Sequence, residues 1–444
     1  MKQLLLCLFC IAFLFSCSSN IEEIDDTENN NTTEETTNEN QTKPNILLVL
    51  ADDMGLDACP GYEIGNTKPN MPNLVGLMNS GVKFNNVWSN PTCSPTRAGI
   101  LTGKYGFRTG VTRAGNSLST SETSIQSYLD SNTNSTYSHA VIGKWHLSNN
   151  NSHPNNLGIN YFAGSISNPI AYDNWALNIN GSTTNSSEYI TSKLTDLAID
   201  WIDNQTKPWF LWLAYNAPHS PFHLPPTELH SQGNLPSDAA SISANPMPYY
   251  LAALEALDTE MGRLLNNMSQ DELDNTVIIF IGDNGTPNQV AQYYGNRRSK
   301  GTIYQGGVNV PMVVSGYGIT RENTTEDALI NSLDIFATVA DIAETGSSEI
   351  NDSKSFKGLF TNVSASKRAY IYTEGDDDNG LLNTTIRNET HKYILFGDGS
   401  EALYNLVSSP LENTNLLSFN QAPLSEEDRS IKDDLISKLN AISD

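Results

Sequence analysis

The feature that most constrains the fold is a pair of apolar runs, each followed at once by carboxylate or amide side chains. Residues 45–51 are rich in Ile, Leu and Val, and residues 277–281 form a second apolar run of strand length. Such continuous runs are typical of parallel strands that are buried on both faces of a sheet. We therefore expect an α/β fold in which both runs are central strands of a large sheet.

The ends of these two runs predict a metal site. Asp52 and Asp53 follow the first run, and Asp283 and Asn284 follow the second. Ligand sites in open α/β sheets lie at the carboxyl ends of strands, and adjacent carboxylates repel each other unless a cation joins them. Two such ends side by side would offer oxygen donors to calcium or magnesium. A solvated turn is the alternative for either end alone.

The segment 91–103 places Cys93 at a predicted junction between a loop and a helix. Pro95 suits the first turn of a helix, which residues 98–101 would continue. Backbone donors at a helix N-terminus favour a bound oxyanion, and Arg97 would add a fixed positive charge. A thiol among such groups is activated. The simpler alternative is a buried, inert cysteine.

The sequence around Cys93 resembles a family signature. The segment reads Pro-Thr-Cys-Ser-Pro-Thr-Arg-Ala-Gly-Ile-Leu-Thr-Gly, and Cys-x-Pro-x-Arg is similar to the motif of the formylglycine-dependent sulfatases, in which the cysteine is oxidised to an aldehyde-bearing residue. The Asp-Asp-x-Gly and Gly-Asp-Asn-Gly segments after the two apolar runs resemble the metal motifs of that family. The resemblance implies an alkaline-phosphatase-like fold with a large mixed, mainly parallel sheet sandwiched by helices.

Two further strands are predicted to carry motifs of the same family. A strand over 138–142 leads into Gly-Lys-Trp-His-Leu, which contains Lys144 and His146. In extended backbone, residues two apart point to the same face. The strand predicted over 209–214 leads into Ala-Pro-His-Ser-Pro, which contains His219 and resembles the family segment that carries an acid histidine.

Lys300 begins a block that matches the family with two departures. Lys-Gly-x-x-Tyr and the later Gly-Gly and Val-Pro pairs resemble the family pattern. Gln305 stands where the family has an acid, and Asn309 stands where it has an arginine. The loss of that possible ion pair leaves the local packing in doubt, whereas the lysine is retained.

The resemblance implies a nucleophile and one calcium ion. Cys93, converted to formylglycine, would attack as a hydrated aldehyde. The ion would lower the pKa of this nucleophile and polarise the sulfate. Its implied ligands are Asp52, Asp53, modified Cys93, Asp283 and Asn284.

The resemblance also implies roles for basic residues. Three cations would offset the charge of the sulfate group, namely Arg97, Lys144 and Lys300. His219 would protonate the leaving oxygen, and His146 would act as a base in the aldehyde-hydrate cycle. His223 is either a substrate contact or a surface residue.

Two other functions are compatible with the sequence. One is a phosphodiesterase or phosphonate hydrolase of the same superfamily. The other is not an enzyme but a surface lipoprotein that binds glycans without catalysis.

The charge composition of the chain limits the kinds of molecule that it can bind. A net charge of −25 argues against a nucleic-acid partner. The implied partners are a sulfated poly- or oligosaccharide, such as ulvan, carrageenan, fucan or glycosaminoglycan, and a formylglycine-generating maturation enzyme. The loops expected to select the substrate are residues 149–156, 163–185 and 376–382.

The N-terminal residues predict an exported lipoprotein. Residues 1–16 fit a signal peptide, and Leu-Phe-Ser-Cys resembles a lipobox that would make Cys17 the lipidated residue. A plain cleaved signal is the alternative. Residues 17–42 are acidic and polar, so we expect a flexible tether. The protein would be anchored to the outer membrane through lipid only, at its periplasmic face or at the cell surface.

The remaining chain divides into two predicted parts. Residues 43–345 would form the catalytic domain, and 346–444 a small C-terminal α+β subdomain with an antiparallel sheet and a terminal helix near 426–442. Besides Cys93, Cys59 is the only cysteine downstream of the predicted anchor, so a disulfide between them stays open. Such a bridge would consume the proposed nucleophile.

Overall fold

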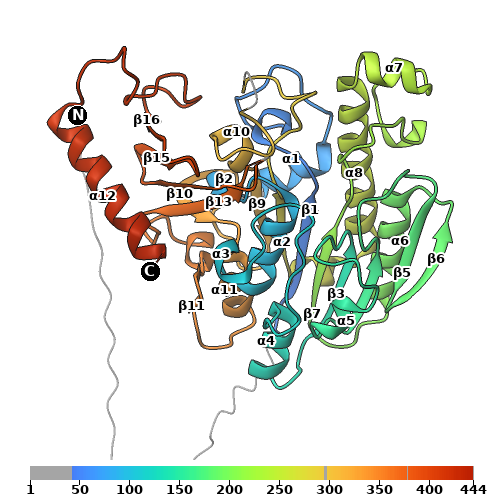
Figure 1. Ribbon diagram of the computed structural model, residues 1–444. Coiled ribbons are helices and arrows are strands. Elements are labelled where there is room, and N and C mark those ends of the chain that lie inside the picture. The colour runs from blue at the N-terminus through green and yellow to red at the C-terminus, as the bar shows by residue number, and fades with distance from the viewer. Residues whose placement is uncertain (1–42, 295–297, 378, 444) are drawn as a thin grey trace, which may run out of the picture. The chain divides into compact units, whose positions relative to one another are not determined.

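The computed structural model describes residues 43–294, 298–377 and 379–443 (Figure 1). The predicted signal peptide, the lipidation of Cys17 and the tether over 17–42 lie outside these ranges. Within them, every helix is too short or too polar to cross a bilayer.

A ten-stranded mixed sheet forms the centre of the fold, in the order β10-β2-β9-β8-β1-β7-β3-β4-β5-β6. Its middle strands β8, β1, β7 and β3 run parallel to one another, and β9 pairs with β8 in the antiparallel sense. The strands are β1 (Asn45–Ala51), β2 (Gly81–Trp88), β3 (Ser138–Gly143), β4 (Tyr161–Gly164), β5 (Trp175–Ile179), β6 (Ser182–Ser186), β7 (Trp209–Ala214), β8 (Thr276–Gly282), β9 (Met312–Gly316) and β10 (Thr324–Asn331).

Helices cover both faces of this sheet. The α-helices are α1 (Pro72–Asn79), α2 (Cys93–Thr102), α3 (Gly106–Thr109), α4 (Ile125–Asn132), α5 (His153–Asn156), α6 (Ile190–Asp203), α7 (Ala239–Ala244), α8 (Met247–Asn267), α9 (Gln270–Asp274), α10 (Gln305–Val308), α11 (Asp334–Ile342) and α12 (Glu426–Ser443). Short 3-10 helices lie at Leu56–Ala58, Thr227–Leu229 and Lys357–Phe360.

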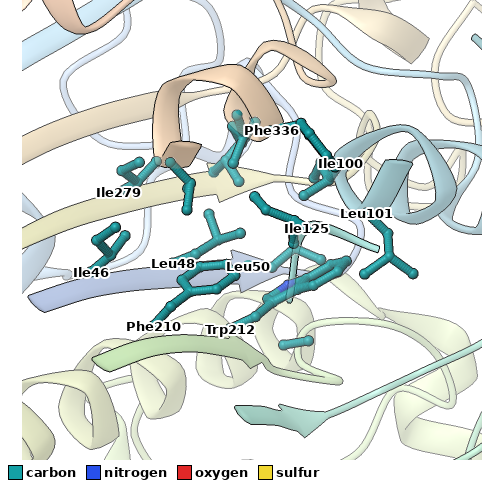
Figure 2. Close-up of a cluster of buried hydrophobic side chains, with 14 of the residues drawn as sticks. Ile46, Leu48, Leu50, Ile100, Leu101, Ile125, Phe210, Trp212, Ile279 and Phe336 are labelled. Atoms are coloured by element: carbon teal, nitrogen blue, oxygen red, sulfur yellow. The ribbon is translucent and has the colours of Figure 1, made fainter. Parts of the chain in front are cut away.

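The strand β1 shows why a continuous apolar run suits this position. Leu48 and Leu50 point to one face of the sheet, where they join a core with Ile100 of α2 and Phe336 of α11 (Figure 2). The alternate residues, such as Val49, face the other core, to which α1, α6 and α8 contribute. Because both faces are covered, alternation with polar residues would bury unpaired polar groups.

A four-stranded antiparallel sheet and the helix α12 form the C-terminal region. The sheet has the order β13-β14-β15-β16, and α12 packs on β14 and β15 (Figure 1). Its strands are β13 (Ile371–Asp376), β14 (Leu382–Arg387), β15 (His391–Leu395) and β16 (Glu401–Asn405), preceded by the hairpin β11 (Glu349–Ile350) and β12 (Ser353–Lys354). The antiparallel sheet and terminal helix confirm the predicted fold class.

Candidate active site

The carboxyl ends of four neighbouring strands carry the predicted polar residues. The strands β8, β1, β7 and β3 lie side by side in this order. Asp283 follows β8, Asp52 follows β1, Lys144 follows β3, and the segment after β7 leads to His219. In a parallel sheet these ends lie at one edge. Residues up to 248 positions apart in the sequence, such as Asp52 and Lys300, therefore meet at one site.

Hydrogen bonds join the two acidic strand ends, as the sequence predicted. Ala51 and Gly282 are register partners at the ends of β1 and β8. The backbone N–H of Asp53 donates to Asp283 Oδ1 at 3.0 Å, and Asn284 Nδ2 donates to Asp53 Oδ1 at 2.8 Å. Asp53 adopts a left-handed φ of 76°. This uncommon backbone conformation is typical of functional sites where the surroundings fix the residue.

Three cations surround these carboxylates. Arg97 donates to Asp283 Oδ2 at 2.8 Å and to the Lys144 carbonyl at 2.6 Å. The Lys144 ammonium contacts Asp52, and Lys300 Nζ lies 2.6 Å from Asp53. Apart from Lys300, which is partly exposed, these side chains are buried. Buried charges are tolerated when they are paired and hydrogen-bonded, and this arrangement meets that condition.

The carboxylates differ in their pKa shifts. Burial raises the pKa of Asp52, but the cations Lys144, His219 and Arg97 outweigh burial and hold the pKa below its ordinary value. Burial and the nearby Asp52 carboxylate raise the pKa of Asp283 to about 7, against the opposing effect of Arg97. Crowded acids with divergent pKa values are a common mark of an active or metal site.

The oxygen donors of this site suit a hard cation. Asp52 Oδ1 and Asn284 Oδ1 are buried and have no hydrogen-bond partner among the described residues. Ligand atoms of Asp52, Asp53 and His219 lie within 4.8 Å of one another. Buried oxygens without a donor are costly, and a divalent cation would satisfy them. The structure therefore brings together the four strand-end ligands that the sequence predicted, with His219 beside them.

Cys93 is the first residue of α2, and Pro95 lies in the first turn, as expected. Cys93 is 2% exposed, and its Sγ lies 3.0 Å from His146 Nδ1. Burial raises the pKa of the thiol despite the opposing effect of Lys144. The expectation of an activated thiol is therefore wrong for the unmodified side chain, because burial outweighs the nearby cations. Both Cys93 and Cys59 are free, so the open disulfide alternative is not realised.

The two candidate acid-base histidines, His146 and His219, both lie at this site and both have lowered pKa values. His146 has a left-handed φ of 55°, and Ser94 Oγ donates to its carbonyl at 2.8 Å. Burial and Lys144 lower the pKa of His146 to about 3, so its imidazole is neutral near physiological pH. His219 Nε2 lies 3.8 Å from Asp53 Oδ2. Burial also lowers the pKa of His219, although Asp52 opposes this shift.

His223 packs among aromatic side chains beside this site. Its ring stacks on Tyr172 with centroids 3.7 Å apart, and Nε2 lies 3.0 Å from the Tyr189 hydroxyl. Its Nδ1 lies 3.1 Å from the Pro221 carbonyl. Both ring nitrogens of His223 thus have protein partners, and a contact with substrate stays a prediction.

The two departures from the family pattern are accommodated locally. Gln305 Oε1 accepts a hydrogen bond from Trp88 Nε1 at 2.8 Å. Asn309 Oδ1 accepts from the backbone N–H of Val87 at 3.1 Å, and its Nδ2 donates to a backbone carbonyl of the same strand. Both neutral amides thus have hydrogen-bond partners within the fold in place of the ion pair of the family pattern.

Two supporting contacts were not predicted from the sequence. The Tyr250 hydroxyl of α8 donates to the Asp53 carbonyl at 2.8 Å. Thr286 Oγ1 accepts from the Gly55 backbone at 3.1 Å and donates to the buried Asp57 carboxylate, which ties the loops after β1 and β8 together. Tyr250 gave no signal in the sequence, since it belongs to a helix with an apolar pattern. Asp57 and Thr286, in contrast, lie within a few residues of the metal motifs.

Comparisons with known proteins agree on one family. A family model described as "Sulfatase" matches residues 44–345. The uncharacterized sulfatase YdeN of Escherichia coli (strain K12) is 29% identical over 366 residues, which cover 68% of this chain and 63% of that protein. Arylsulfatase G of Mus musculus is 26% identical over 456 residues, which cover 87% of this chain and 82% of that protein. The chain thus spans less than two thirds of the first relative.

A solved structure supports the same fold. It is described as BT4656 in complex with its substrate D-glucosamine-2-N,6-O-disulfate, and it superimposes with a TM-score of 0.75. The match has 20% sequence identity and covers 90% of this chain and 98% of that chain. The likeness extends over the mixed sheet and its helices and shows a shared fold.

Proposed function

This chain belongs to the sulfatase family of the alkaline phosphatase superfamily, and we propose that it removes sulfate from a sulfated carbohydrate with a formylglycine nucleophile and a bound calcium ion. The main observation behind this proposal is that Cys93, three cations and four oxygen ligands lie together at one edge of the sheet. Support for a carbohydrate comes from the similar structure, whose described substrate is a disulfated glucosamine.

The proposed nucleophile lies at the N-terminus of α2. Formylglycine at position 93, when hydrated, would supply one hydroxyl for attack on sulfur and a second for later release of sulfate. The neutral His146 imidazole, 3.0 Å from Sγ of the unmodified residue, would accept a proton from this group. Ser94 would keep that imidazole in place through its bond to the His146 carbonyl.

The calcium ion would be held by Asp52, Asp53, Asp283 and Asn284 together with position 93, and would supply Lewis-acid stabilisation of the sulfate oxygens. Two of these ligands, Asp52 and Asn284, have buried oxygens that accept no hydrogen bond from the described residues. A bound cation would also oppose the burial and the repulsion from Asp52 that together raise the pKa of Asp283.

The remaining basic residues would act on the sulfate group and the leaving oxygen. Lys144 and Lys300 lie beside the Asp52 and Asp53 carboxylates and would neutralise the sulfate once the ion takes these carboxylates as ligands. His219 would donate a proton to the leaving alkoxide oxygen. Its lowered pKa would rise when an anionic sulfate ester binds next to it, because a negative charge favours the imidazolium form.

We place this enzyme at the cell envelope on the basis of its N-terminal residues. A lipidated Cys17 followed by an acidic tether would hold the catalytic region at the outer membrane, where a polysaccharide can reach it. Sulfated algal polysaccharides or their oligosaccharides are the proposed substrates. Metabolic labelling with a fatty acid, compared between the wild type and Cys17→Ala, tests the anchor.

The activity is tested by release of inorganic sulfate from a panel of sulfated carbohydrates. The protein should be made with a formylglycine-generating enzyme and assayed with calcium and with a chelator. We expect Cys93→Ala to lose turnover by on the order of 10⁴-fold or more, because no other residue supplies the nucleophile. Cys59→Ala serves as a matched control, since Cys59 is also free and buried. Equal turnover in Cys93→Ala and the wild type would contradict the mechanism.

A further inference from the structure

A cavity is formed by the loops that follow β3 and β4 together with the hairpin β5–β6. Its volume is about 560 Å³, and the residues that line it lie between positions 149 and 185 of the sequence. Small-molecule sites in proteins commonly have volumes of about 300–1,000 Å³. The cavity includes two of the three loops expected to select the substrate, although residues 175–186 form the hairpin β5–β6 rather than an irregular loop.

The lining of this cavity is polar but carries no charge. None of the residues that line it in the described structure is Lys, Arg, His, Asp or Glu. Side-chain amides dominate instead, and we call the cavity the asparagine pocket after Asn149, Asn151, Asn168, Asn174, Asn178 and Asn185. A cavity without acids or bases offers no ion-pair partner to a charged group of a ligand, so it suits neutral groups.

Some of these amides are fixed and others are available to a ligand. Asn185 Nδ2 donates to Asn174 Oδ1 at 2.9 Å, and Asn178 Nδ2 donates to Thr183 Oγ1 at 3.0 Å. Asn149 and Asn168 are exposed, and their side chains have no hydrogen-bond partner among the described residues. Each free amide offers both donors and an acceptor, which match the hydroxyl groups of a sugar.

The pocket is connected to both candidate catalytic histidines by one segment, 165–172. The Ile166 carbonyl accepts from the backbone N–H of His146 at 3.0 Å. At the other end, the Tyr172 hydroxyl donates to the His219 carbonyl at 2.7 Å. Residues 165–171 of this segment line the pocket. The segment that lines the pocket is thus hydrogen-bonded to the backbone of both histidines.

We propose that the asparagine pocket binds an unsulfated sugar ring that adjoins the sulfated ring, so that the substrate is an oligosaccharide or polysaccharide with a neutral neighbour. This inference rests on the proposed sulfatase activity and specifies its substrate class. A sulfate on the neighbouring ring would lose water without gaining a cation, and burying such an unpaired charge is costly. The pocket therefore selects both for a second ring and against a second sulfate.

The first test compares substrates with and without a neighbouring ring. The probes are 4-nitrophenyl sulfate and carrageenan disaccharides sulfated on one ring. For the double variant Asn149→Ala, Asn168→Ala, we expect the ratio of kcat/KM for the preferred disaccharide to that for 4-nitrophenyl sulfate to fall about tenfold, through lost hydrogen bonds. Asn413→Ala is the matched control, because Asn413 is exposed and lies outside the pocket.

The second test adds a sulfate to the neighbouring ring of the same disaccharides. We expect the wild type to prefer the monosulfated form by about tenfold or more, and Asn168→Lys to narrow that preference by supplying a cation. A wild-type preference for the disulfated form would overturn the inference. So would an unchanged ratio in the double alanine variant, or hydrolysis of 4-nitrophenyl sulfate but of no disaccharide. Failure to hydrolyse any sulfate ester would instead overturn the proposed function on which the inference rests.

Discussion

At the scale of single residues, the site depends on groups that the motifs contain and on groups far from them. Cys93, Lys144 and Asp52 could be predicted, because each belongs to a contiguous motif with a chemical reason for its residue types. Tyr250 could not be predicted, since its hydroxyl reaches Asp53 only after the helix α8 packs on the sheet. A buried tyrosine in an apolar helix looks like core in the sequence. The raised pKa of the Cys93 thiol escaped prediction for the same reason, as burial is set by packing.

The Tyr250 contact predicts an effect on metal affinity. Tyr250→Phe removes the donor that holds the Asp53 carbonyl and its left-handed backbone. Outer-shell partners of this kind typically change metal affinity by about 10–100-fold, so we expect calcium to bind at least about tenfold more weakly by calorimetry. Tyr249→Phe is the control, because the Tyr249 hydroxyl donates instead to the Pro236 carbonyl. Equal calcium affinity in both variants would show that Tyr250 does not position Asp53.

At the scale of elements, strands with continuous apolar runs were predicted and short polar strands were not. The strand β7 was predicted with its observed bounds, and β1 was as well, because both are buried on two faces. In β6, by contrast, four of the five residues are exposed, and the strand has no apolar pattern to detect. Its pairing with β5 is set by the fold of the chain around it. The loop predicted over 163–185 therefore missed this hairpin, and its role in substrate selection stays a prediction.

Gly143, at the end of β3, is a position where substitution by alanine should strongly reduce the stability of the protein. Gly143 has a φ of 122°, and a Cβ there would lie 1.9 Å from the Ala214 carbonyl oxygen of β7. The same oxygen accepts from the backbone N–H of Lys144. We expect Gly143→Ala to lower the free energy of unfolding in urea by about 3 kcal/mol or more, through strain and displaced backbone. Gly76→Ala in α1 has open space around it and is the control, which we expect to be neutral or slightly stabilising.

At the scale of the whole molecule, the C-terminal sheet supports the segment that precedes the proposed nucleophile. Thr373 Oγ1 of β13 donates to the Ser89 carbonyl at 2.9 Å, and Asn90 Nδ2 donates to the Glu374 carbonyl at 3.0 Å. The pattern of strands and a final helix was predicted from the sequence. Its packing beside the Cys93 segment was not, because contacts across nearly 300 residues leave no local signal.

Glu374 at this junction predicts a pH dependence of stability. Burial raises its pKa from 4.5 to about 7 in the folded protein, although the backbone N–H of Phe107 and the Tyr372 hydroxyl donate to it. The unfolded state therefore loses this proton first. The free energy of unfolding should fall as pH rises from about 4.5 to 7, by on the order of 3 kcal/mol, and this contribution should stay constant above that range.

Comparison of urea unfolding across that pH range tests the role of Glu374. In Glu374→Gln the side chain keeps an acceptor for the Phe107 amide but cannot ionise, so the fall in stability between these pH values should shrink by that amount. Glu389→Gln, at an exposed position, is the control. The same pH dependence in the wild type and in Glu374→Gln would assign the effect to another group.

The proposed nucleophile can be tested through the mass of the peptide that contains Cys93, taken from protein made in its native host or with a formylglycine-generating enzyme. We predict that the thiol is replaced by an aldehyde, so that the peptide loses sulfur and gains reactivity toward hydrazides. The peptide that contains Cys59 should keep its thiol and reports on nonspecific oxidation. An unmodified Cys93, in a preparation where a known sulfatase is fully converted, would contradict the proposed nucleophile.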